Sequence, residues 1–217
     1  MFRNYQIINP TINEAYKKYA DLLGKRRLEV AILLASLFIM IFGMMDMVIY
    51  PDVAKKLIGT RIITDTILGF IFLLSRKKQL KNLKLSCLLV VISILIMINA
   101  LIFMTEGMSS PYYAGLSLTI VALSVMLPWS FVEALVAFSI MIILYLLTSF
   151  LHSAINSLPY NLPLLANNLF FLVSTGVFCI VASYLSSRLR FDEFCLNFKL
   201  KEAMNNLQST QSQLIQS

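Results

Sequence analysis

Long apolar runs separated by short polar turns dominate the chain. A hydrocarbon core about 30 Å thick is crossed by about 20 helical residues, and lipid offers exposed backbone amides no hydrogen-bond partner. Six runs approach that length, and the fourth is the shortest. They span residues 28–50, 57–74, 85–104, 112–127, 131–151 and 162–186. The pattern predicts an all-α, polytopic membrane protein with six transmembrane helices.

The charged residues are scarce and unevenly placed. They make up 13% of the 217 residues, whereas soluble domains carry about 25%. Between Lys84 and Arg188 the ionisable residues of the Asp, Glu, Lys, Arg and His types are Glu106, Glu133 and His152. A water-soluble surface cannot be built from that segment. The net charge of +7 therefore indicates membrane topology and not a nucleic-acid partner.

The basic residues indicate the orientation of the chain. Six precede the first run, five lie between the second and third, and four follow the sixth. Six crossings place all fifteen on one side, while the other side receives Lys55 and Lys56 and Arg61 lies within the second run. The positive-inside rule then predicts a multi-pass membrane protein with both termini in the cytoplasm.

The segment before the first run has an amphipathic pattern. Ile12, Tyr16, Tyr19 and Leu23 recur at helical spacing among basic residues. This predicts a short helix on the inner membrane surface that ends near Gly24. A basic leader that only sets the topology is the alternative.

Polar residues within the membrane runs form the candidate site. They fall in the outer half of the predicted bundle, where they could line a cavity for a small ligand with tyrosines and His152 at its mouth. The candidate ligand-binding residues are Asp46, Arg61, Asp65, Asn99, Tyr112, Tyr113, Asn167 and Asn168. In the alternative interpretation, Arg61 neutralises Asp65 or Asp46, the asparagines bond between helices, and the tyrosines form an interfacial belt. His152 alone is typical of a solvated loop residue.

Catalytic signatures are missing from the sequence. It has one histidine, and no HExxH, GxSxG or glycine-rich phosphate loop. Asp46 and Asp65 could form a carboxylate dyad, but Arg61 nearby would keep both ionised. We therefore expect no catalytic residue, metal site or cofactor in these 217 residues.

The composition changes to charged and amide-rich residues from Leu189 onward. Leu200, Leu207 and Leu214 recur every seven residues, and the alternating seam positions hold Leu196, Ala203 and Thr210. This heptad pattern predicts a helix that continues from the sixth span and pairs with a second copy in a coiled coil. An ordinary amphipathic terminal helix is the alternative.

The end of this helix resembles a known signalling element. Residues 206–217, NLQSTQSQLIQS, are similar to the linker helix that runs into the dimerisation and phosphoacceptor helices of bacterial sensor histidine kinases. Residues 108–127, followed by Pro128-Trp129-Ser130, resemble multi-span sensor regions attached to kinases or nucleotide cyclases. The resemblance implies a homodimeric receptor of the bacterial inner membrane whose phosphoacceptor histidine and ATP-binding domain would lie beyond Ser217.

The leading hypothesis is thus the membrane sensor and dimerisation module of a two-component histidine kinase, truncated before the catalytic domains. Its parts would be a basic cytoplasmic segment (1–27), a six-helix transmembrane sensor domain (28–186) and a cytoplasmic linker helix (187–217). Its expected partners are the lipid bilayer, a second copy, a cytoplasmic kinase or other output domain, and an unidentified small ligand. The alternative is a small transporter or channel that uses Asp46, Arg61 and Asp65 along its path.

Overall fold

The protein is a bundle of six α-helices in a computed structural model that describes residues 10–77 and 82–216. Those residues contain no β-strand. The helices are α1 (Pro10–Ile49), α2 (Ala54–Arg76), α3 (Leu83–Met104), α4 (Tyr113–Met126), α5 (Phe131–Ile155) and α6 (Leu162–Gln216), with a short 3₁₀ turn, η1 (Gly107–Ser109), before α4. The predicted all-α membrane fold is confirmed.

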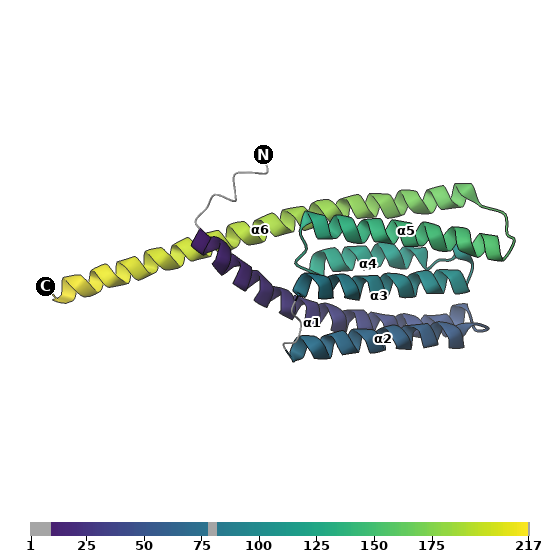
Figure 1. The fold of residues 1–217 in the computed structure, drawn as a ribbon, viewed down its shortest axis with the longest axis horizontal. Coiled ribbons are helices and arrows are strands. Elements are labelled where there is room, and N and C mark those ends of the chain that lie inside the picture. The colour runs from purple at the N-terminus through teal and green to yellow at the C-terminus, as the bar shows by residue number, and fades with distance from the viewer. Residues whose placement is uncertain (1–9, 78–81, 217) are drawn as a thin grey trace.

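Five of these helices are long and apolar enough to cross a membrane. The exception is α4, whose 14 residues span about 21 Å. It corresponds to the fourth and shortest apolar segment of the sequence. It nevertheless lies alongside the other helices, between the two ends of the bundle (Figure 1). The chain therefore passes along the bundle six times.

The helix at the centre of the bundle is α3. In the most apolar 18-residue stretch of α3, 56% of the residues are buried inside the bundle. The corresponding share is 22–28% in the other four long helices. It packs against α2 on one side and against α4 and α5 on the other, and α1 and α6 complete the two sides (Figure 1). Large apolar side chains such as Phe170, Phe178 and Ile63 are exposed on the outside. An apolar exterior of this kind is suited to lipid and not to water.

The first helix is longer than the sequence predicted. α1 passes through Gly24 without a break, so the prediction of a separate helix ending there is wrong. A Cβ at Gly24 would overlap the side chain of Leu83 and would lie 3.2 Å from the Cγ atom of Pro128. The glycine thus permits a close approach of α1 to these neighbours and does not act as a helix stop.

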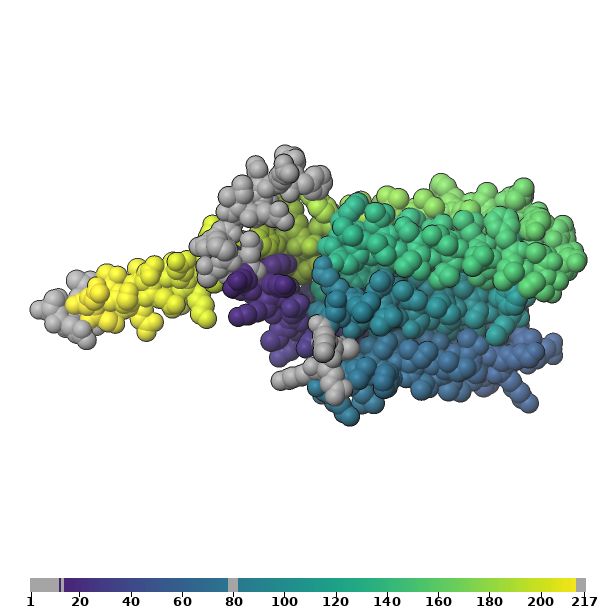
Figure 2. Space-filling view, viewed as in Figure 1, coloured from purple at the N-terminus to yellow at the C-terminus, as the bar shows by residue number. Residues whose placement is uncertain are grey.

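The two ends of the bundle differ in what they carry. One end, which we call the loop end, holds the connections at residues 50–53, 105–112 and 156–161. The other, the terminal end, holds the end of α2, the α4–α5 connection, the start of α1 and the long C-terminal part of α6 (Figure 1). Figure 2 shows this part of α6 projecting well beyond the bundle, with the start of α1 near its base. We call residues 187–216 the α6 extension.

Candidate functional site

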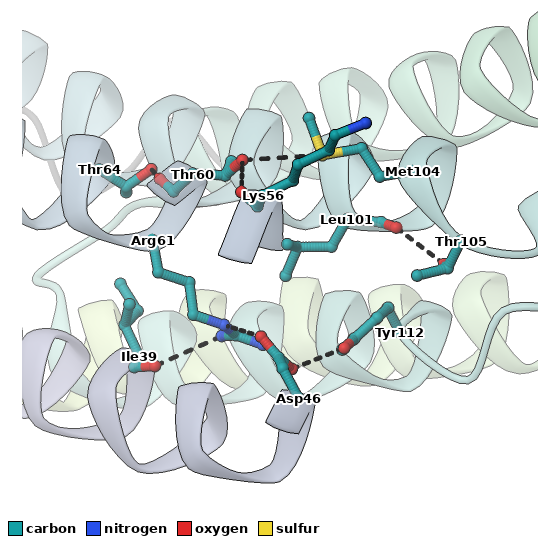
Figure 3. Close-up of polar contacts among 10 residues, drawn as sticks. All are labelled: Ile39, Asp46, Lys56, Thr60, Arg61, Thr64, Leu101, Met104, Thr105 and Tyr112. Carbon is teal, nitrogen blue, oxygen red and sulfur yellow. Dashed lines mark hydrogen bonds and ion pairs between the residues drawn. The ribbon is translucent and has the colours of Figure 1, made fainter. Parts of the chain in front are cut away.

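A buried ion pair joins α1 to α2 near the loop end. The Arg61 Nε atom lies 2.7 Å from Oδ2 of Asp46, and Nη2 donates to Oδ1 at 2.9 Å (Figure 3). Asp46 is 1% exposed and Arg61 is 4% exposed. The two parallel bonds form the fork geometry that makes arginine-carboxylate pairs strong. Nη1 also donates to the Ile39 carbonyl at 3.4 Å.

Local sequence explains why Arg61 turns toward α1. Gly43 lies one turn before Asp46, and a Cβ there would be 3.2 Å from the Arg61 Cδ atom. The missing side chain leaves room for the arginine stem between the two helices. Sequence analysis left open whether Arg61 pairs with Asp46 or Asp65, and the structure pairs it with Asp46.

Tyr112 extends this pair to the start of α4. Its hydroxyl donates to the Asp46 Oδ1 atom at 2.6 Å, and its ring centroid lies 5.9 Å from the Arg61 guanidinium carbon (Figure 3). Its ring also packs against that of Tyr50, with centroids 5.8 Å apart. The Tyr50 hydroxyl in turn donates to Glu106 at 3.3 Å. Polar contacts thus join α1, α2 and the start of α4, and the Tyr50 bond adds the α3–α4 connection.

Asp65 does not join this group. It lies at the midpoint of α2, which runs from residue 54 to residue 76. Both of its carboxylate oxygens are buried, and no described residue forms a hydrogen bond of good geometry with them. The polar side chains near enough to stabilise its charge are Ser36 of α1 and Arg61, which lies one helical turn away. An unpaired carboxylate at this depth is costly.

A second polar group surrounds Asn168 of α6. Its Nδ2 atom donates to the Met108 carbonyl of η1 at 3.0 Å and to the Tyr145 hydroxyl of α5 at 2.9 Å. Asn168 and Tyr145 are completely buried. These bonds fix the first turns of α6 to the loop end of the bundle.

The remaining candidate residues are dispersed. Asn99 bonds to the Leu95 carbonyl of its own helix at 2.8 Å, and its side-chain oxygen has no partner among the described residues. Tyr113 is half-buried against the core, whereas Asn167 is exposed on the outside of the bundle. The candidate residues therefore form one triad, Asp46, Arg61 and Tyr112, and one separate group around Asn168.

His152 is placed differently from the sequence-based interpretation. It lies in the last turn of α5 and is 6% exposed, so it is not a solvated loop residue. Its ring occupies the space beside Gly107, whose φ is +58°. The sequence analysis also missed the roles of Tyr50, Tyr145 and Glu106, because only tertiary packing brings them to these contacts.

The α6 extension has two distinct faces. On one, Tyr16 of α1 packs against Phe191 and Phe194, with ring centroids 5.0 and 5.3 Å apart. Leu196 follows Phe194 by two residues, which is about 200° around a helix. The predicted seam therefore lies opposite the α1 contact, and its described side chains are all exposed: Leu196, Leu200, Ala203 and Leu207. The side chain of Leu214 lies outside the described part.

The fold and these contacts define a multi-span helical membrane protein with an ordered polar end and one long helix that projects from the opposite end. The sequence matches the model of the MASE8 family over residues 44–201, which is 158 of its 217 residues. The chain belongs to this family of membrane-associated sensor domains. No curated protein and no solved structure matches it.

Proposed function

We propose that this sensor domain transmits a signal from its loop end to a cytoplasmic output domain through a homodimeric α6 extension. The observation that carries the proposal is the continuity of α6. Its 55 residues form one helix about 80 Å long, which begins beside the buried Asn168 group and ends far outside the bundle. A rigid element of this kind can couple two distant places.

The contacts at the base of the α6 extension support this mechanism. Nη1 of Arg190 donates to the Ser186 hydroxyl at 2.6 Å, and Nη2 donates to the Trp129 carbonyl at 3.2 Å. The helix is thus held both at Asn168 and where it leaves the bundle. A signal that shifts helix packing at the loop end by about 1 Å would reach the extension as a translation or rotation of α6.

The exposed seam supports homodimerisation. Leucines at heptad spacing form an apolar stripe that a partner helix covers in a coiled coil. In this chain α1 packs on the opposite face and leaves the stripe uncovered. Three heptads are marginal alone, so the two membrane bundles would supply the remaining association. The resemblance of residues 206–217 to kinase linkers makes a histidine kinase our first choice of output domain, and a nucleotide cyclase our second.

Register insertions test this function. We fuse a histidine kinase catalytic region after Ser217 and insert one to seven alanines after Leu196. One inserted residue rotates the downstream helix by about 100°, whereas seven restore the heptad phase. Kinase autophosphorylation in membranes is expected to change severalfold with one or two alanines and to return toward the starting level with seven.

A matched control separates register from simple disruption. In a second fusion, a flexible glycine-serine linker joins Ser217 to the same kinase region, and the same alanines inserted into this linker should leave autophosphorylation constant. Activity that is indifferent to every insertion after Leu196, or that falls steadily with insertion length, would contradict transmission through α6.

A further inference from the structure

A hollow of about 500 Å³ opens at the loop end of the bundle. It is formed by the end of α3, the η1 turn, the last turn of α5 and the α5–α6 connection. The lining residues are Thr105, Glu106, Ser109, His152, Asn156 and Leu158. Nearly all of these side chains are polar, although the helices that hold them are strongly apolar.

His152 gives this hollow an unused buried polar group. The imidazole packs edge-on against Phe103, with ring centroids 5.9 Å apart, and against the backbone of Gly107. Neither ring nitrogen forms a hydrogen bond with any residue in the described ranges. A polar side chain that is more than nine-tenths buried normally has a partner. Because His152 lines the hollow, a molecule bound there can bond to an imidazole nitrogen.

The available atoms of the hollow are mainly acceptors. The Glu106 carboxylate accepts one long bond, from Tyr50 at 3.3 Å. The Nδ2 atom of Asn156 donates to the His152 carbonyl at 2.9 Å, and the side-chain oxygen of Asn156 accepts no hydrogen bond from a described residue. The Thr105 hydroxyl is already bonded to the Leu101 carbonyl at 2.8 Å.

This inventory selects the class of ligand. The lining holds the Glu106 carboxylate and no Lys or Arg side chain, so an anion would meet a like charge there. The described residues include no cluster of three or more His, Cys, Asp or Glu side chains that could hold a metal ion. An ammonium group supplies both a positive charge and several N–H donors, and Leu158 offers a wall for a short alkyl chain.

We propose that this hollow binds a small organic ammonium ion, held by the Glu106 carboxylate, by one ring nitrogen of His152 and by the side-chain oxygen of Asn156. The same η1 turn that contributes Ser109 to the wall offers the Met108 carbonyl to Asn168 of α6. A bound ammonium ion that draws on Glu106 and His152 would therefore act on the contact that fixes the start of α6. This inference rests on the proposed sensor function and names the chemical class of its signal.

Calorimetry on the purified 217-residue chain in nanodiscs tests the binding directly. Butylammonium and putrescine are the probes, and sodium butyrate at equal ionic strength is the anionic comparison. We expect saturable binding of the ammonium probes and not of butyrate. Glu106→Gln is expected to weaken binding by about tenfold or more, because it removes a charge-assisted bond. Glu106 is exposed, so this variant should fold normally.

Two further variants complete the design. His152→Phe keeps a ring beside Phe103 but removes both nitrogens, and is also expected to weaken binding. Asp52→Asn removes an exposed carboxylate from the same end of the bundle that does not line the hollow, and should bind as the original chain does.

The possible results separate this inference from the proposed function. An absence of saturable binding, equal binding to Glu106→Gln, or equal affinity for butyrate would overturn the ammonium site, even if the register insertions behave as expected. Binding that is lost in Glu106→Gln and His152→Phe would establish the site even if the insertions have no effect.

Discussion

Replacing Arg61 with alanine is expected to lower the free energy of unfolding by about 3–5 kcal/mol, because it leaves the buried Asp46 carboxylate without its cation. Asp46 is 1% exposed, and among the described residues its side chain would keep the Tyr112 hydroxyl as its one partner. Denaturant titration of the detergent-solubilised protein measures the effect. Trp129, the one tryptophan of the chain, is buried in the α4–α5 turn and reports unfolding by its fluorescence.

Two comparisons make this result specific. The double variant Asp46→Ala with Arg61→Ala leaves no unpaired charge and should be more stable than Arg61→Ala alone. Asp65→Asn removes a carboxylate that has no hydrogen-bond partner among the described residues, so it should be neutral or stabilising. Equal losses in Arg61→Ala and Asp65→Asn would contradict the assignment of the ion pair to Asp46.

Replacing Gly176 with leucine is expected to destabilise the bundle by roughly 3 kcal/mol. Gly176 lies on α6, and even a Cβ at this position would overlap the ring of Phe138 on α5. The larger side chain can be accommodated only if the Phe138 ring is displaced or α5 and α6 move apart. Because α6 is the proposed output helix, this variant should also change the activity of a fused kinase.

A glycine in a similar helical setting provides the control. Gly69 of α2 has open space where a Cβ would stand, so Gly69→Leu should cost nothing and could gain from better helix propensity. Gly176→Ala is a milder variant that adds only the Cβ atom. The double variant Gly176→Ala with Phe138→Ala should recover part of the stability that Gly176→Ala loses. If Gly69→Leu and Gly176→Leu are equally stable, the close contact between α5 and α6 is wrong.

The sequence predicted the helices well because a membrane imposes length and hydropathy on each span. Six runs became six helices, and the shortest run became the 14-residue α4. Ser130 and Glu133, three residues apart at the start of α5, form a capping box in which the Ser130 amide donates to Glu133 at 3.0 Å. Capping is local, so the spacing of the two residues is sufficient to predict it.

The contacts within the site depended on tertiary packing that spacing does not specify. Asp65 stands one turn from Arg61 on the same helix, yet Arg61 bonds to α1, where Gly43 leaves room. Asn167 and Asn168 are adjacent, but about 100° of helical rotation exposes one and buries the other. The position of His152 requires the missing side chain of Gly107, because a Cβ there would overlap the imidazole, and a single sequence does not reveal this contact.

Cysteine labelling in intact bacterial cells tests most directly whether the loop end faces outward and the α6 extension faces the cytoplasm. In a Cys195→Ser background, a membrane-impermeant maleimide should label Asp52→Cys in intact cells. It should label Ser209→Cys only after the membrane is permeabilised. Both positions are exposed in the structure, so burial does not bias the comparison. Labelling of Ser209→Cys from outside, or of both positions from the same side, would contradict an outward sensor joined by α6 to a cytoplasmic output domain.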